Sequence, residues 1–225
     1  TIYSKEGKLI SNLIEVPLIE ELPEGFMSVR KGKRNFSWRL DKPSSLTYVE
    51  ALDEGDPSIS VEFRDEVFEI DAPFNGDGKT IIKTINRFSG IDWGTENIAI
   101  AYDYWWNTRN RKAYLFNPSD FKKQTKIIYD RNYQDVYSDP GIFMKSRNDF
   151  NKNVLTIHSG YTFLNGSGFT KDGQFPFIDK VNLSNLSKQR IYQSTYTNKL
   201  ESIQDYDPDN KKLIVRIESP TEFPN

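Results

Sequence analysis

Cysteine is absent from this sequence, and histidine occurs only once, as His158. Without cysteine the chain forms no disulfide and no thiolate metal site. A single imidazole leaves little material for a histidine metal centre or for histidine-based acid–base chemistry. No apolar run approaches the length of a membrane span. The 30 basic and 32 acidic residues give a net charge of −2, which lacks the positive excess of a nucleic-acid binder. We therefore expect no nucleic-acid partner and no membrane partner.

Aromatic side chains are abundant instead, with 15 Phe, 12 Tyr and 4 Trp among 225 residues. Such residues favour strands and bury large areas, so they build a core even where apolar residues are only 36% of the chain. Short apolar runs alternate with turn residues, and no long stretch has capped helical periodicity. The expected strands span 46–52, 60–70, 80–85, 97–104, 112–116, 126–129, 154–158, 175–183, 189–193, 200–206 and 212–218. The sequence predicts an all-β fold.

One block, from Trp38 to Pro57, shows how these strands are organised. Asp41-Lys42-Pro43 and Gly55-Asp56-Pro57 are turn residues on either side of a short apolar strand. Similar turn-then-strand units recur at about 50 to 60 residues, near the length of a four-stranded propeller blade. We expect a partial β-propeller of four-stranded antiparallel blades at 34–85, 88–130 and 142–193, with half-blades at 1–14 and 200–218. The alternative is a single β-sandwich with Greek-key links.

Half-blades at both ends have a further implication. A propeller protects its edges by radial closure, so we expect this chain to be a segment of a larger propeller. Unpaired edge strands also invite pairing with another chain, and we expect self-association through them.

An ordered set of short motifs is more specific than the strand pattern. The block at 38–57 is followed by motifs that lie at 64–68, 87–91, 105–109, 130–131, 137–141 and 218–222. Together they resemble the propeller of glutamyl endopeptidases, a branch of the prolyl oligopeptidase family of serine peptidases found in plastids and in Bacteroidetes-like bacteria. The resemblance implies a propeller that caps an α/β-hydrolase domain, whose Ser-Asp-His triad lies beyond this chain. It also implies a peptide substrate, cleavage after Glu, and a periplasmic or secreted location in a Bacteroidetes-like bacterium.

The residues themselves predict no catalytic residue, no metal site and no cofactor. Gly166-Ser167-Gly168 lacks the Gly-x-Ser-x-Gly spacing of a hydrolase nucleophile. Adjacent residues on a strand point to opposite faces, so His158 and Ser159 would not form a nucleophile–base pair, and we interpret His158 as structural. The acidic stretch 205–210 has the alternation of a calcium loop, but Asn210 stands where the sharp turn needs Gly. We read that stretch as a hairpin connection.

Arg109 and Arg111, which follow Trp105-Trp106, are the candidate substrate-binding residues. A guanidinium recognises an acidic side chain through bidentate hydrogen bonds. The alternative is packing by the Trp pair, with the arginines paired to Asp103 or Glu96.

Other arginines are open to similar readings. Arg39, Arg64 and Arg87 lie near strand ends. Like Arg109 and Arg111, each could bind an acidic substrate side chain or form a structural ion pair. The basic run from Arg30 to Arg34 reads as a solvated loop.

These observations lead to a non-catalytic role. We expect the chain to cap and gate the active site of a serine peptidase whose hydrolase domain is its partner in the same polypeptide. Two alternatives are a stand-alone propeller module that binds a protein or a glycan, and a complete enzyme with an unrecognised site.

Overall fold

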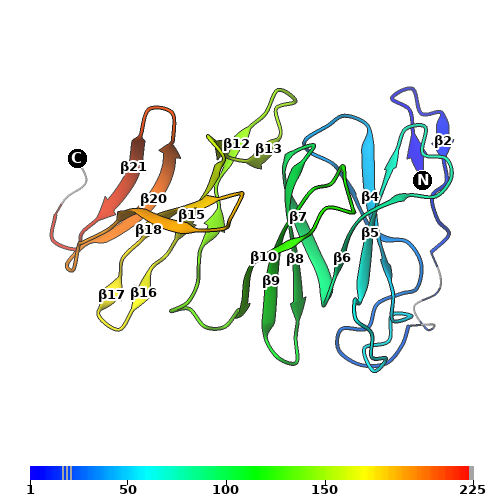
Figure 1. The fold of residues 1–225 in the computed structure, drawn as a ribbon, viewed down its shortest axis with the longest axis horizontal. Coiled ribbons are helices and arrows are strands. Elements are labelled where there is room, and N and C mark those ends of the chain that lie inside the picture. Colours follow the sequence, from blue (N-terminus) through cyan, green and yellow to red (C-terminus); the bar gives the residue numbers. More distant parts are fainter. Residues whose placement is uncertain (17, 19, 21, 223–225) are drawn as a thin grey trace. The chain divides into compact units, whose positions relative to one another are not determined.

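The computed structural model describes residues 1–222 except 17, 19 and 21. For the run 13–22, Pro17 and Pro23 predict a loop rather than a turn of helix, and this run lies partly outside the described residues. The fold is all-β, as predicted, and is built from small antiparallel sheets (Figure 1). None of the described residues forms a helix long and apolar enough to cross a membrane. Two compact units are present: residues 1–132 with 147–154, and residues 133–146 with 155–225.

The first unit contains two four-stranded meanders. One sheet has the order β3-β4-β5-β6, and the other has the order β10-β9-β8-β7. The strands are β3 (Arg34–Trp38), β4 (Ser45–Ala51), β5 (Asp65–Asp71), β6 (Lys79–Thr84), β7 (Arg87–Thr95), β8 (Ile98–Trp105), β9 (Asn110–Phe116) and β10 (Lys126–Asn132). A small ladder of β1 (Ile2–Tyr3) and β2 (Leu9–Ser11) precedes them.

Alternating side chains explain how these sheets build a core. In β5, Asp65, Val67 and Glu69 are buried while the residues between them are partly exposed, as the two-residue period of a strand requires. Val67 joins the main apolar cluster of this unit, which also includes Ile81, Trp93 and Tyr114. The face of β5 that buries Val67 therefore also buries two carboxylates.

The second unit contains a sheet in which β11 (Ile142–Phe143), β15 (Tyr161–Gly166), β18 (Phe177–Asn182) and β19 (Lys188–Gln193) are neighbours in that order. β14 (Ile157–His158) also pairs with β15. Two further ladders are β16 (Phe169–Thr170) with β17 (Gly173–Gln174), and β20 (Leu200–Asp207) with β21 (Lys212–Glu218). Phe163, Ile178 and Ile203 form the apolar cluster of this unit. β12 (Lys145–Arg147) and β13 (Asn153–Leu155) form a separate two-stranded ladder.

Several strand predictions were wrong in their bounds. No strand was predicted over 87–95, yet these residues form β7, in which Trp93 pairs with Ala99. The run 154–158 is two short strands, because the Thr156 amide donates to Met144 O rather than continuing one ladder. β15 was not predicted, although Phe163 and Leu164 are in its buried part.

Candidate functional site

Arg109 and Arg111, the predicted substrate-binding residues, flank the start of β9. β8 ends at Trp105, and a turn over 106–109 leads into β9 at Asn110. The Arg109 amide donates to Trp106 O across this turn at 3.2 Å, and Arg109 has a left-handed backbone with φ +55°. The turn therefore places Arg109 beside Trp106.

The Arg109 side chain folds back onto its own turn. Its guanidinium lies 3.7 Å from the ring centroid of Trp106, and its Nη1 donates to Trp106 O. The Trp106 ring also stacks on Phe26, with the ring centroids 4.6 Å apart. Trp106 is thus held in place by an aromatic contact and by a cation–π contact.

Arg111 is exposed, and its guanidinium lies 5.7 Å from the Tyr102 ring. The alternative in which the arginines pair with Asp103 or Glu96 is not found in the described structure. Asp103 instead accepts hydrogen bonds from the Asn86 amide and the Tyr114 hydroxyl. Substrate binding by Arg109 and Arg111 stays a prediction.

Trp106 and Phe26 line a cavity of about 340 Å³ in the first unit. Phe88 and Tyr104 extend the aromatic wall, and Ser28 and Asn35 add polar groups. Two charged side chains complete the lining, and both are arginines: Arg34 at the start of β3 and Arg87 at the start of β7. The cavity is therefore aromatic on its walls and basic where the two strands begin.

Both arginines are almost completely buried, with 4% of Arg34 and 2% of Arg87 exposed. Arg34 Nη2 lies 2.6 Å from Asp65 Oδ1. Arg87 Nη1 contacts Asp53 Oδ1 at 2.8 Å and Asp65 Oδ1 at 3.1 Å. Arg64 joins the group through Asp53 Oδ2 at 2.6 Å. We call these five residues the open cluster: three guanidinium groups and two carboxylates, with one positive charge in excess.

The donors of the open cluster are not all used. Arg87 Nε donates to Met27 O at 2.9 Å, but Arg87 Nη2 has no acceptor in the described chain, and neither do Arg34 Nε and Nη1. Burial lowers the pKa of the Arg34 guanidinium, and the charge of Asp65 opposes this effect. Buried donors without acceptors are costly, because they lose their hydration and gain nothing in return.

The turn at Gly55 connects the open cluster to the wall of the cavity. Asp53 Oδ1 accepts the Gly55 amide at 3.1 Å, and Gly55 O accepts the Val29 amide at 3.0 Å. Gly55 has φ +78°, and a Cβ at this position would lie 2.0 Å from Val29 O. Only glycine therefore fits this turn, which fixes the segment from Met27 to Val29 beside the arginines.

The sequence did not reveal the open cluster. The reading of the run from Arg30 to Arg34 as a solvated loop was wrong for Arg34, which is buried in β3. Its partner Asp65 comes from β5, two strands further along the sheet. Two members of the open cluster were signalled: Arg64 and Arg87, near strand ends, were two of the three arginines with an open interpretation.

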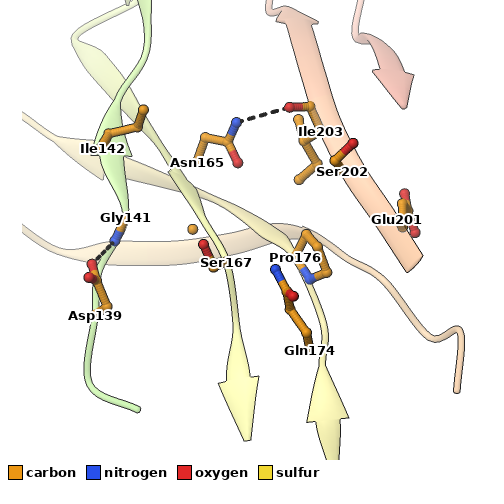
Figure 2. A pocket seen from close by; sticks show the side chains of 11 residues that line it. Asp139, Gly141, Ile142, Asn165, Ser167, Gln174, Pro176, Glu201, Ser202 and Ile203 are labelled. Atoms are coloured by element: carbon orange, nitrogen blue, oxygen red, sulfur yellow. Dashed lines mark hydrogen bonds between the residues drawn. The ribbon is translucent and has the colours of Figure 1, made fainter. Parts of the chain in front are cut away.

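A second cavity of about 300 Å³ lies in the second unit, among the ends of β15 and β20 and the turns before β11 and β18 (Figure 2). Ser167 is on its wall, but no histidine or lysine lines it. Asn165 spans one side, where its Nδ2 donates to Ile203 O at 3.3 Å (Figure 2). Glu201 is 1% exposed; Tyr192 donates to its Oε1, whereas its Oε2 has no partner in the described residues. This cavity is polar and does not contain a nucleophile–base pair.

His158 lies at the end of β14, and its Nδ1 is 2.7 Å from Asp209 Oδ1. Asp209 belongs to the turn between β20 and β21, where Asp207 Oδ1 accepts the amides of Asp209 and Asn210. The hairpin predicted for 205–210 is confirmed. Within the described residues, no three His, Asp or Glu side chains gather in a way that would hold a metal ion.

Sequence comparisons link the chain to two plant proteins, each named "Probable glutamyl endopeptidase, chloroplastic". The chain is 36% identical over 200 residues to the one from Oryza sativa subsp. japonica, which covers 86% of this chain and 21% of the rice protein. It is 32% identical over 225 residues to the one from Arabidopsis thaliana, which covers 96% of this chain and 23% of the plant protein. No family model matches the chain.

The chain thus spans between a fifth and a quarter of the length of these relatives. The predicted resemblance to glutamyl endopeptidases is confirmed at the level of this name. Over most of its length, the chain is a sequence relative of plant proteins named glutamyl endopeptidase.

Proposed function

We propose that this chain is a non-catalytic β-propeller segment of a glutamyl endopeptidase-like serine peptidase of the prolyl oligopeptidase family. One observation carries the proposal: the two relatives match 86% and 96% of this chain, while the chain covers only 21% and 23% of them. In each relative, the matched region is therefore a small part of a much longer polypeptide. In this proposal, the reacting groups lie in an α/β-hydrolase domain outside the 225 residues.

The architecture supports this role. Each four-stranded sheet of the first unit is a meander in chain order, which is how a propeller blade is built. We propose that the blades at 34–85, 88–130 and 142–193 restrict entry to the peptidase site, so that short or extended peptides pass and folded proteins do not.

The contacts of the described residues are consistent with a non-catalytic role. The one imidazole, His158 in β14, contacts Asp209 in the turn between β20 and β21, and a Ser-His-Asp triad also needs a serine within reach of the histidine. The partner of this segment would be the hydrolase domain of the same polypeptide, and its substrate a peptide with Glu before the cleaved bond.

Activity assays test the proposal. The 225-residue chain should neither hydrolyse a glutamyl peptide nor react with a fluorophosphonate probe, whereas the longer polypeptide that contains it should do both. Hydrolysis by the chain alone would contradict the proposal and favour a complete enzyme. Inactivity of the longer polypeptide would favour a stand-alone binding module.

Arg109 and Arg111 provide a second test, in the longer enzyme. Arg109→Ala and Arg111→Ala should each raise KM for a glutamyl substrate by about tenfold with little change in kcat, because a lost charge-assisted hydrogen bond weakens binding. Arg147→Ala is the control, since Arg147 is exposed and, among the described residues, its side chain bonds to Asn151 alone. Unchanged kinetics in both test variants would remove these residues from substrate binding.

A further inference from the structure

We propose that the cavity beside the open cluster binds a peptide carboxylate, with Arg34 and Arg87 as its charged ligands. Both side chains line the cavity, both are at least 96% buried, and both keep guanidinium nitrogens without an acceptor in the described chain. A carboxylate supplies two acceptor oxygens in the planar arrangement that a guanidinium recognises best. The cavity residues indicate that the ligand is a carboxylate. That this carboxylate belongs to a peptide rests on the proposed function.

Arg39, an arginine of the same unit that is buried to the same extent, is the appropriate comparison. Arg39 is also 4% exposed, yet its Nε and Nη2 bond to Asp41, and its Nη1 bonds to Glu69. Arg39 does not line the cavity. Arg34 and Arg87, which do line it, are as buried as Arg39 and yet keep guanidinium nitrogens without an acceptor in the described chain.

The net positive charge of the open cluster also favours an anionic ligand. The three guanidinium groups of the open cluster face the carboxylates of Asp53 and Asp65, which are both fully buried. One more carboxylate would bring the cluster to neutrality. Because the site is screened from water, a charge-assisted hydrogen bond made there is stronger than one at the surface.

The cavity walls fit a side chain better than a large ligand. A volume of about 340 Å³ is at the lower end for small-molecule sites. Phe26 and Trp106 are 71% and 39% exposed and stack on one another, so they form an aromatic rim over which a peptide would pass. A glutamyl side chain or the C-terminal carboxylate of a short peptide would then reach the arginines.

Three versions of one short peptide show whether the bound carboxylate comes from a glutamyl side chain or from the C-terminus. The first version has an internal Glu and an amidated C-terminus. The second has Gln in place of that Glu and a free C-terminus, and the third has Gln and an amidated C-terminus. Calorimetric titration of the 225-residue chain should show the third peptide binding at least about tenfold more weakly than the better of the other two, the loss expected for one charge-assisted hydrogen bond. Equal binding of all three, or tighter binding of inorganic phosphate than of glutarate, would overturn the proposal.

Two variants connect the binding to the arginines. Arg34→Lys keeps the charge but removes the fork of donors, and it should weaken binding of the preferred peptide by about tenfold. Arg39→Lys is the matched control: it makes the same change at an equally buried site outside the cavity, and affinity should stay within about twofold. Equal losses in both variants would overturn the proposal.

Asn35→Asp keeps the test decisive if Arg34→Lys fails to fold. Asn35 lines the cavity next to Arg34, and aspartate is nearly the same size and tolerates its left-handed backbone. The added negative charge should weaken binding of the preferred peptide by about tenfold. Unchanged affinity would contradict the proposal, while peptide hydrolysis by the longer polypeptide would still test the proposed function separately.

Discussion

Two groups of charged side chains are built on carboxylates from one buried face of β5. They differ in how completely their guanidinium groups are paired. The open cluster is built on Asp65. The other group, which we call the closed cluster, is built on Glu69 and also contains Arg39, Asp41, Lys42 and Asp71. Val67 separates the two carboxylates on this buried face.

The charges of the two clusters differ in sign. The closed cluster has two basic and three acidic side chains, and each nitrogen of the Arg39 guanidinium has a partner. The open cluster has three basic and two acidic side chains, and three guanidinium nitrogens lack acceptors. One strand therefore supports two ionic groups: at one end the buried guanidinium has a partner for each nitrogen, and at the other end, beside a cavity, buried guanidinium nitrogens lack acceptors in the described chain.

The largest expected effect comes from removing the central carboxylate of the open cluster. Asp65→Ala leaves Arg34 and Arg87 without a shared acceptor and also frees the Phe88 amide, which donates to Asp65 Oδ2 at 2.8 Å. The free energy of unfolding should fall by about 3–5 kcal/mol, as for other broken buried ion pairs. Urea denaturation measures this loss.

Glu66→Ala is the control for this experiment. Glu66 is the next residue on β5 and lies on the other face of the strand, where it accepts the Thr80 hydroxyl at 2.7 Å and lies 3.7 Å from Lys83. Its loss should cost about 1–2 kcal/mol, because one hydrogen bond and one long ion pair are removed. If the two variants lose equal stability, Asp65 is not the centre of a buried ionic group.

A smaller loss is expected from the turn that supports the open cluster. Gly55→Ala places a Cβ 2.0 Å from Val29 O and also strains a backbone with φ +78°. We expect a loss of about 2–4 kcal/mol, together with weaker peptide binding, because the cavity wall from Met27 to Val29 must shift.

Gly76→Ala separates these two causes. Gly76 has a similar φ of +85°, but a Cβ there would meet nothing within 4 Å. The cost should be only the backbone strain of about 1 kcal/mol. Thermal unfolding of both variants checks the difference, and equal shifts would rule out the clash with Val29.

The smallest effect concerns the closed cluster and depends on pH. The Ser45 hydroxyl, followed by Lys42, holds the pKa of Asp71 below its ordinary value of 3.8. A lowered pKa in the folded state stabilises the protein above pH 3.8, and this stabilisation is lost as the pH falls through the lowered pKa.

Asp71→Asn should therefore be less stable than the wild type at pH 7, by less than about 1 kcal/mol because the carboxylate is largely exposed. The difference should shrink as the pH falls below 3.8. Denaturation curves at pH 7 and in acid measure it, and a difference that grows in acid would reverse the sign assigned to Asp71.

The sequence predicted local features of the fold better than the site. Turn residues on both sides of β4 marked a strand, and the all-β class followed from many such short runs. β15 was missed although its aromatic and β-branched residues, bounded by glycines, are typical of a short strand. β7 was missed as well; within it, Asp92 accepts a hydrogen bond from the Tyr102 hydroxyl at 2.7 Å across the ladder.

The candidate site was harder to predict, for a physical reason. Whether an arginine is solvated or buried depends on which carboxylate the fold brings to it, and Asp65 reaches Arg34 only through the pairing of β3, β4 and β5. Arg109 and Arg111 were visible in the sequence as a local run, while Arg34 and Arg87 belong to a pattern that exists only in three dimensions. The predicted arginines and the buried ones lie in the same region, because Arg109 packs on Trp106 at the rim of the cavity that Arg34 and Arg87 line.

The most direct test of the contrast between the two clusters observes the guanidinium groups themselves. Arginine ¹⁵Nε–¹Hε resonances of the 225-residue chain can be followed by NMR while glutarate is added. We predict that the Arg34 resonance shifts saturably, because its Nε has no acceptor within the described chain, whereas the Arg39 resonance, whose Nε bonds to Asp41 at 3.0 Å, stays in place. An unmoved Arg34 resonance, or equal shifts of both, would contradict the account.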